Sequence, residues 1–297
     1  MTTPPATVKQ SRYTELRARL TAVERPPLRQ FRIGLQADTY AISEIRIPAR
    51  ERIPRSRWSP RIFLNGGAHG DEPAGVEALL QFMEQRRYDA WPEITFALIP
   101  CLNPWGLVQN TREGPAGRDL NRAFRRASPD TPEVSQIKRA LGRRRFSLSM
   151  DCHEDCDADG FYAYELPEVS SLGRTVVEAV GAVGPISSDC LVDDAVPVRD
   201  GLARTDELRP QAAQEMAPSM PPEALRDFRM FVEVWPTWPL PIYLWRRSGT
   251  RAFTFETPTT LPLAQRAAMH LAAIDAALNV LRGGGYPRPA DGRQPTP

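Results

Sequence analysis

The sequence is poor in residues that usually indicate a metal site, a disulfide framework or a membrane segment. Its 297 residues include only three histidines, four cysteines and two lysines, Lys9 and Lys138. Four cysteines are too few for a disulfide framework in a chain of this length. The first thirty residues lack the apolar segment of a secretory signal, and no apolar run is long enough to span a membrane. We therefore expect a cytoplasmic protein that does not contact a membrane.

The sequence also lacks a strong charge of either sign. Its formal net charge is +2, so no overall field favours binding to nucleic acid. Almost all the positive charge is arginine, which can reflect the base composition of the gene as easily as function. No interleaved aromatic residues or nucleic-acid motifs accompany the arginine clusters at Arg122, Arg125, Arg126 and 143–145. We predict no nucleic-acid partner.

The chain divides into three parts by composition. Residues 1–30 form a polar N-terminal lead-in with one short helix, and residues 31–285 are expected to form a single domain. Within that domain, residues 185–245 are rich in proline and tryptophan, which favours an elaborated loop or lid over a regular repeat of strand and helix. Residues 286–297 are predicted to be a disordered tail.

Strands alternate with helices through most of this domain. Residues 31–49 alternate apolar and polar residues around an Ala-Asp turn, which predicts an antiparallel hairpin. Further strands are predicted at 61–67, 93–100, 146–154 and 251–257, and helices at 73–88, 132–144, 171–183 and 261–285. This order predicts the α/β class, with a mixed, mostly parallel central sheet flanked by helices on both faces.

A histidine and a glutamate follow the first strand of this alternation. In "FLNGGAHGDEP", His69 and Glu72 lie between a buried strand and a helix, and glycines flank the histidine. A catalytic zinc site needs three protein ligands and an open position for water, and it accepts both imidazole and carboxylate. His153 ends another predicted strand and can supply the third ligand, whereas His270 lies inside an apolar helix, where a packed histidine is expected. Because strand ends meet at one edge of such a sheet, we predict a His₂Glu site.

Two further groups suit the same chemistry. Glu256 ends the apolar strand "FTFET" and is the candidate general base, because a carboxylate beside a metal-activated water can accept its proton. The segment "NTREGPAGRDLNRAF" supplies Arg112, Arg118 and Arg122. Arginine can stabilise an oxyanion or bind a carboxylate through two hydrogen bonds.

Taken in order, these motifs resemble the zinc metallocarboxypeptidases, the funnelin family, and among them the bacterial murein peptide amidases and small carboxypeptidases. The matching elements are "HGDE", "NPWG", "TR" followed by "GRDLNRAF", "DCH" and "FTFET", within residues 60–280. The resemblance implies the zinc carboxypeptidase-like fold, also called phosphorylase/hydrolase-like, one zinc ion per chain, and hydrolysis of an amide bond next to a free carboxylate. The expected substrate is a small peptide or a modified amino acid.

The resemblance also implies a role for each matching residue. His69, Glu72 and His153 would hold the zinc ion, and Glu256 would be the general base. Arg112 would polarise the scissile carbonyl, Asn121 and Arg122 would hold the substrate carboxylate, and Asp119 would orient His69 from behind. Tyr243 is the nearest candidate for the family's substrate-contacting tyrosine, although the proline-rich insertion makes that alignment unsafe.

The sequence departs from the family pattern at Arg118, Ala123, Cys152 and Glu154. Acidic residues near His153, namely Glu154, Asp155, Asp157 and Asp159, suggest a substrate with a free amine or a basic side chain.

Several alternatives remain open. The aspartoacylase and succinylglutamate desuccinylase branch shares His-x-x-Glu and Asp-Leu-Asn-Arg but deacylates N-acyl amino acids. We favour the peptidase because Arg112 precedes Asn121 by nine residues, and because only 41 residues follow Glu256, where the deacylases carry a further β-rich domain. A catalytically inactive metal-binding scaffold is a third possibility, although no predicted ligand or base is missing.

Two other cation sites are less favoured. Residues 155–160 resemble the start of an EF-hand loop, but Leu166 occupies the position of the final glutamate ligand. Cys152 and Cys156 could form a metal or redox pair, although two small core or loop residues are the simpler interpretation.

Overall fold

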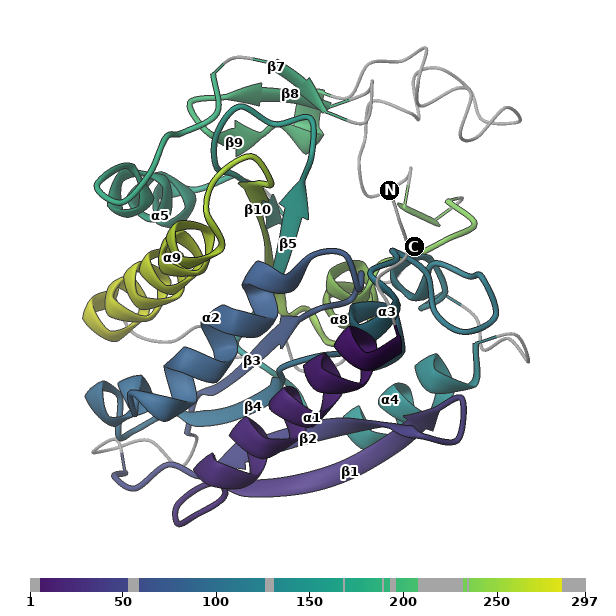
Figure 1. Cartoon of the computed structure of the whole chain (residues 1–297). Coiled ribbons are helices and arrows are strands. Elements are labelled where there is room, and N and C mark those ends of the chain that lie inside the picture. The colour runs from purple at the N-terminus through teal and green to yellow at the C-terminus, as the bar shows by residue number, and fades with distance from the viewer. Residues whose placement is uncertain are drawn as a thin grey trace.

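The computed structural model describes residues 6–52, 59–125, 131–167, 169–188, 190–192, 196–207, 232–233 and 235–284. Its strands are β1 (Arg29–Gln36), β2 (Tyr40–Ile47), β3 (Arg61–Gly66), β4 (Thr95–Ile99), β5 (Leu148–Asp155), β6 (Tyr162–Leu166), β7 (Cys190–Val192), β8 (Val196–Arg199), β9 (Leu202–Ala203) and β10 (Arg251–Pro258). They form a ten-stranded sheet in the order β1-β2-β4-β3-β5-β10-β6-β9-β8-β7 (Figure 1).

The predicted N-terminal hairpin is confirmed. β1 and β2 pair antiparallel from Arg29 opposite Arg46 to Gln36 opposite Tyr40. Ala37, Asp38 and Thr39 connect the two strands. Ala37 and Asp38 have φ angles of 44° and 54°, the left-handed conformation that suits a tight hairpin.

The four strands at the centre of the sheet are parallel. β3 lies between β4 and β5, and β10 lies on the other side of β5, each with parallel pairing. β5 is buried along almost its whole length, as expected for a strand covered on both faces. The outer strands add antiparallel pairs, so the sheet is mixed and its centre is parallel, as predicted. Parallel strands end at the same edge, and this edge collects the loops that follow β3, β5 and β10.

Helices cover both faces of the sheet (Figure 1). One face is covered by α1 (Ala6–Val23), α2 (Pro73–Glu84), α5 (Ser171–Gly181) and α9 (Leu263–Gly284), whose buried residues share a core cluster with β3, β5 and β10. The other face is covered by α4 (Pro132–Leu141) and α8 (Leu240–Ser248), which pack in a second apolar cluster. The prediction of helices on both faces is confirmed. Leu16, Leu20 and Val23 of α1 enter the first core, so the N-terminal segment contributes apolar packing as well as a polar surface.

A short helix and a strand are among the elements that were not predicted. The short helix α3 (Pro104–Gln109) lies in a segment rich in Asn, Gly and Pro, a composition typical of a loop. Its first turn is held by the Asn103 side chain, which accepts a hydrogen bond from the Gly106 amide at 2.9 Å, and Pro104 occupies the first turn. The strand β6 pairs antiparallel with β10, and the paired residues are about ninety positions apart in the sequence. No local sequence pattern predicts such a pairing.

The region predicted as an elaborated insertion contains β7, β8, β9 and the start of α8, around an apolar cluster that includes Val198 and Trp245. Most of its middle, residues 208–231, lies outside the described residues, as do residues 286–297, predicted to be disordered. Among the helices described, none is both long enough and apolar enough to cross a membrane.

Candidate metal centre

The loop between β3 and α2 carries His69 and Glu72. Gly67 has a φ of +59°, a backbone conformation that is strained for any residue with a side chain. A Cβ on Gly70 would lie 1.9 Å from the backbone carbon of Gly106, so this loop packs against α3 at a distance that only glycine allows. α2 begins at Pro73, directly after Glu72. The glycines beside His69 therefore permit this loop by backbone conformation at Gly67 and by close packing at Gly70.

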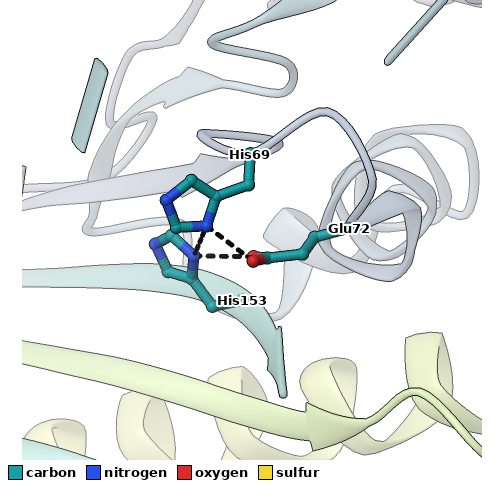
Figure 2. A group of neighbouring side chains, drawn as sticks. All are labelled: His69, Glu72 and His153. Carbon is teal, nitrogen blue, oxygen red and sulfur yellow. Dashed lines mark hydrogen bonds and ion pairs between the residues drawn. The ribbon is translucent and has the colours of Figure 1, made fainter. Parts of the chain in front are cut away.

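His153 comes from β5 and meets this loop at the carboxyl edge of the sheet. Its Nδ1 lies 2.7 Å from Oε2 of Glu72 and 3.2 Å from Nδ1 of His69, and Nδ1 of His69 lies 2.5 Å from Oε1 of Glu72 (Figure 2). All three side chains are buried. One nitrogen of each ring and the carboxylate thus point at a common position, with ligand atoms within 4.8 Å of one another. Two imidazoles and one carboxylate are a donor set that zinc accepts.

The charges of these side chains and their neighbours shift one another's pKa values. Burial by itself would raise the pKa of Glu72, but the positive charge of His153 and His69 and their hydrogen bonds lower it to about 2. Burial would lower the pKa of His153, but the carboxylates of Asp151 and Glu72 outweigh it and raise that pKa well above 6.5. The nearby carboxylates thus favour a positive charge at this position.

Asp119 lies behind His69. Its Oδ1 is 3.3 Å from Nε2 of His69, and its Oδ2 accepts a hydrogen bond from Nε of Arg112 at 3.0 Å. Burial opposes ionisation of Asp119, but its bonds to His69 and the charges of His69 and Arg112 keep its pKa below the usual range. Arg112 also reaches within 3.6 Å of Oε1 of Glu72, with 41% of its side chain exposed. The arginine thus stands at the margin of the cluster with part of its guanidinium open to solvent.

Asn121 is buried against His153. Its Nδ2 lies 3.1 Å from Nε2 of His153, and its Oδ1 accepts a hydrogen bond from the amide of Leu240 at 2.9 Å. Arg122 is half-buried, and its Nη1 donates to the carbonyl of Asn121 at 3.3 Å. Both residues lie close to the cluster, but the amide of Asn121 faces a histidine in this structure.

Glu256 is brought to the same edge by β10. It lies opposite His153 in the parallel register with β5 and opposite Tyr162 in the antiparallel register with β6. Facing residues on neighbouring strands point to the same side of a sheet, so Glu256 lies on the side of the ligand His153. Tyr243 lies on α8, where its ring packs 5.9 Å from that of Phe124 and beneath the ammonium of Lys138. Its predicted substrate contact stays a prediction.

The comparisons with known proteins agree with this geometry. Residues 59–168, which contain the three candidate ligands, match the family described as the succinylglutamate desuccinylase/aspartoacylase catalytic domain. A search of curated proteins finds no match.

Solved structures share the fold over most of the chain. A proposed metallopeptidase from Shewanella amazonensis SB2B has a TM-score of 0.66 at 20% identity, covering 92% of both chains. A metallo-carboxypeptidase from Burkholderia cenocepacia has a TM-score of 0.61 at 17% identity, covering 90% of this chain and 68% of the other. The chain therefore has a zinc carboxypeptidase-like α/β fold. A metallo-carboxypeptidase from Pseudomonas aeruginosa, solved with (2-guanidinoethylmercapto)succinic acid, has a TM-score of 0.62 at 18% identity, covering 92% and 69%. At these identities the likeness establishes the fold, and the proteins named in both comparisons are hydrolases.

Two carboxylates of β5 lie next to the cluster in the sequence, and their contacts were not predicted. Asp151 lies two residues before His153 on β5, and its Oδ2 is 3.2 Å from Nε2 of that histidine. Glu154 is fully buried, accepts a hydrogen bond from the amide of Ala74 at 2.7 Å and pairs with Arg266 of α9. The period of two along a strand could have identified Asp151, because residues two apart point to the same face.

The acidic residues after His153 are engaged in the fold. Asp155 accepts hydrogen bonds from the Asp157 amide and the Tyr162 hydroxyl, both at 2.8 Å. Asp159 accepts hydrogen bonds from the hydroxyls of Ser187 and Ser188. These contacts give the carboxylates of Asp155 and Asp159 partners within the fold, and the preference for a substrate with a free amine stays a prediction. The segment also joins two strands, β5 and β6, instead of the paired helices of an EF-hand.

Cys152 and the third histidine lie in the core, whereas Cys156 does not. Cys152 is fully buried. A Cβ on Gly75 of α2 would lie 2.7 Å from the Cβ of Cys152, so Cys152 packs against this helix. Cys156 is exposed, and both cysteines are free thiols. Burial raises the pKa of Cys152 well above 9. His270 is fully buried, with Nε2 3.3 Å from the hydroxyl of Thr257, and burial lowers its pKa to about 3, as expected for a packed neutral histidine.

Proposed function

We propose that this chain is a zinc-dependent hydrolase that cleaves an amide bond next to a free carboxylate. The observation that carries the proposal is the convergence of Nδ1 of His69, Nδ1 of His153 and the carboxylate of Glu72 on one buried position. These three residues would hold one zinc ion per chain. When bound there, the ion would polarise a carbonyl oxygen and make water more acidic.

The positions of three other predicted residues support their roles. Glu256, in register with His153, would take a proton from the attacking water and return it to the leaving amine. Arg112, at the margin of the cluster, would donate hydrogen bonds to the oxygen that becomes negative. Asp119 would hold His69 in place from behind, as metal-binding imidazoles usually require.

Arg122 and Asn121 would bind the substrate carboxylate. Both lie beside the cluster, and Arg122 is only half-buried. The Pseudomonas aeruginosa relative was solved with a derivative of succinic acid, a dicarboxylic acid, which is consistent with a carboxylate anchor in this fold. We expect a small peptide or a modified amino acid as the substrate. We also propose that residues 31–285 form the catalytic domain, with residues 185–245 as an insertion.

A second candidate function is deacylation of N-acyl amino acids. It is favoured by the match of residues 59–168 to the succinylglutamate desuccinylase/aspartoacylase catalytic domain. The two functions use the same ligands and base and differ in which side of the amide bond carries the bulk of the substrate. We place the peptidase first because solved structures that share the fold over 90–92% of the chain include proteins named as a metallopeptidase and a metallo-carboxypeptidase.

The test is a substrate panel with a matched pair of variants. Short peptides with a free carboxyl end are compared with N-acetyl and N-succinyl amino acids, and release of free amine is measured. Glu256→Gln should keep zinc and lose nearly all turnover, because an amide cannot accept the proton. Asp155→Asn, at the end of the neighbouring strand, should stay near wild type. Turnover of Glu256→Gln within about tenfold of wild type would overturn the base assignment, and hydrolysis of only the N-acyl amino acids would favour the second candidate.

A further inference from the structure

Asn103 lies between the loop that carries His69 and Glu72 and the loop that carries Arg112. Its backbone amide donates a hydrogen bond to the carbonyl of Gly67 in the first loop at 2.8 Å. Its side-chain Nδ2 donates to two carbonyls of the second loop, at 3.2 Å to that of Arg112 and at 2.9 Å to that of the next residue. One residue therefore connects the backbones of both loops.

The side-chain amide of Asn103 is fully buried, and both of its ends have partners. Its Oδ1 accepts hydrogen bonds from the amide of Gly106 at 2.9 Å and from Nε2 of Gln36 at 3.0 Å. Gln36 is itself fully buried, and its Oε1 accepts a hydrogen bond from the amide of Trp105 at 3.0 Å. A primary amide has two N–H donors and an oxygen that accepts two hydrogen bonds, so the Asn103 amide is fully used and held in one orientation.

Two glycines allow the loops to approach Asn103 closely. A Cβ on Gly106 would lie 2.3 Å from Nδ2 of Asn103, and a Cβ on Gly70 would lie 1.9 Å from the backbone carbon of Gly106. The amide of Gly70 also donates to the carbonyl of Thr111 at 3.0 Å. The ligand loop, the start of α3 and the residue before Arg112 are therefore packed against one another without space for a further side chain at either glycine.

The segment that carries Arg112 has no regular secondary structure to hold it. Residues 111–119, all of which the structure describes, contain no helix or strand. The guanidinium of Arg112 is oriented at its far end, where Nε donates to Oδ2 of Asp119 at 3.0 Å. The hydrogen bonds from Asn103 hold the other end, the backbone from which this side chain extends. A donor to a developing negative charge must be placed accurately, because a displacement of about 1 Å can cost about 100-fold in rate.

We propose that Asn103 is a positioning residue for Arg112, and that it fixes the guanidinium relative to the loop of His69 and Glu72. This inference rests on the proposed function, in which Arg112 donates hydrogen bonds to the oxygen that becomes negative. Asn103 itself acts through Arg112 and does not bind the substrate. Because the oxygen becomes negative only in the transition state, loss of this support should lower kcat and leave KM nearly unchanged.

The test uses two substitutions of Asn103 that keep an acceptor for the first turn of α3. Asn103→Asp has the same shape and keeps Oδ1, but it presents an oxygen instead of an N–H group to the carbonyls of the Arg112 loop. Asn103→Ser keeps a capping hydroxyl, lacks the amide that reaches these carbonyls and introduces no buried charge, so it carries the test if Asn103→Asp does not fold. The matched control is Asn110→Asp at the other end of α3, whose Oδ1 accepts from Nη1 of Arg12 at 3.1 Å and can still do so.

Activity is measured on the fastest substrate of the panel of peptides and N-acyl amino acids. Both Asn103 variants should lower kcat by about 10–100-fold, the cost of displacing a catalytic group by about 1 Å. KM and zinc affinity should stay near the wild-type values, because the backbone amide at position 103 still holds the ligand loop. Asn110→Asp should be near wild type in all three quantities. In the Arg112→Ala background, Asn103→Asp should lower kcat no further, because its effect passes through the missing guanidinium.

A spectrum follows Arg112 without any substrate. The signal of its Nε–H group, which donates to Asp119, is the one that disappears from the ¹H–¹⁵N spectrum of the full chain in Arg112→Lys. Both Asn103 variants should shift this signal and speed its exchange with water, and Asn110→Asp should leave it unchanged. Circular dichroism would show that each variant is folded.

The outcomes separate this inference from the proposed function. Wild-type kcat in Arg112→Ala, or no hydrolysis of any compound in the panel, would overturn the proposed function, and the Arg112 signal would still test whether Asn103 holds this side chain. A loss of kcat in Arg112→Ala with wild-type kcat in a folded Asn103 variant would overturn the positioning role and leave the function intact. An unchanged Arg112 signal in folded Asn103 variants, an equal loss of kcat in Asn110→Asp, or a further loss in the double variant would also overturn the positioning role.

Discussion

Replacing Arg266 should lower the free energy of unfolding by more than is usual for a residue near the surface. Arg266 of α9 pairs with Glu154, and their side chains are 12% and 0% exposed. Glu154 also accepts a hydrogen bond from the amide of Ala74 at the start of α2. This carboxylate thus joins the strand that carries His153 to the helix that begins after Glu72. Arg266→Met keeps much of the apolar length of the side chain and removes the charge.

The expected cost follows from the burial of Glu154. Leaving one member of a buried ion pair without its partner costs about 3–5 kcal/mol. The hydrogen bond from Ala74 remains, so we expect a loss of about 3 kcal/mol, at the lower end of this range. The double variant Glu154→Gln/Arg266→Met should be more stable than Arg266→Met alone, because no buried charge is left and the Gln oxygen can still accept from Ala74.

The assay is urea unfolding of the metal-free protein, followed by circular dichroism. With an m-value of about 3 kcal/mol/M, a loss of 3 kcal/mol moves the midpoint down by about 1 M. The control is Arg282→Met on the same helix, whose ion pair with Glu93 is 54% exposed on the arginine side and should contribute less than about 1 kcal/mol. An equal shift for both variants, or a double variant no more stable than Arg266→Met, would refute the reasoning.

Two further predictions concern the ligand loop and its proton. Gly70→Ala places a methyl group against the backbone of Gly106 and should cost about 1–3 kcal/mol of stability together with zinc affinity; Gly283→Ala, with open space around it, is the control, and equal effects in thermal unfolding would contradict the packing argument. The raised pKa of His153 stabilises the metal-free fold at pH below 6.5, and this contribution is lost as the pH rises through the raised value. Zinc must displace that proton at pH 7, so calorimetry in two buffers of different ionisation enthalpy should show about one proton released per zinc, and no release would contradict the assignment.

Much of the fold could be predicted because local patterns repeat along the chain. The apolar strand at 61–66, Pro73 at the start of a helix and the apolar strand ending at Glu256 each carry their own signal. β6 could not be predicted in this way, since its pairing with β10 depends on residues far away in the sequence. The helix α3 was missed because Asn103 and Pro104 suggest a loop by composition, although the same two residues start a helix by capping it.

The sequence predicts which residues form the candidate site better than it predicts the contacts that these residues make. His69, Glu72 and His153 each follow or end a strand, and parallel strands bring such positions together. The contacts behind them depend on three-dimensional detail. Nothing local in the sequence shows that Asn121 faces His153, or that Glu154 points away from the ligands toward Arg266. Alternation along β5 explains the second case, because His153 and Glu154 point to opposite faces of the sheet.

The zinc content of the purified protein, compared with that of His153→Ala, tests the central claim most directly. Elemental analysis of the wild type should find about one zinc per chain, and the variant should have lost it, because two remaining ligands do not hold the ion. Circular dichroism would show that the variant is folded. Full zinc in a folded His153→Ala variant, or no zinc uptake by the wild type, would contradict the account of His69, Glu72 and His153 as one metal site.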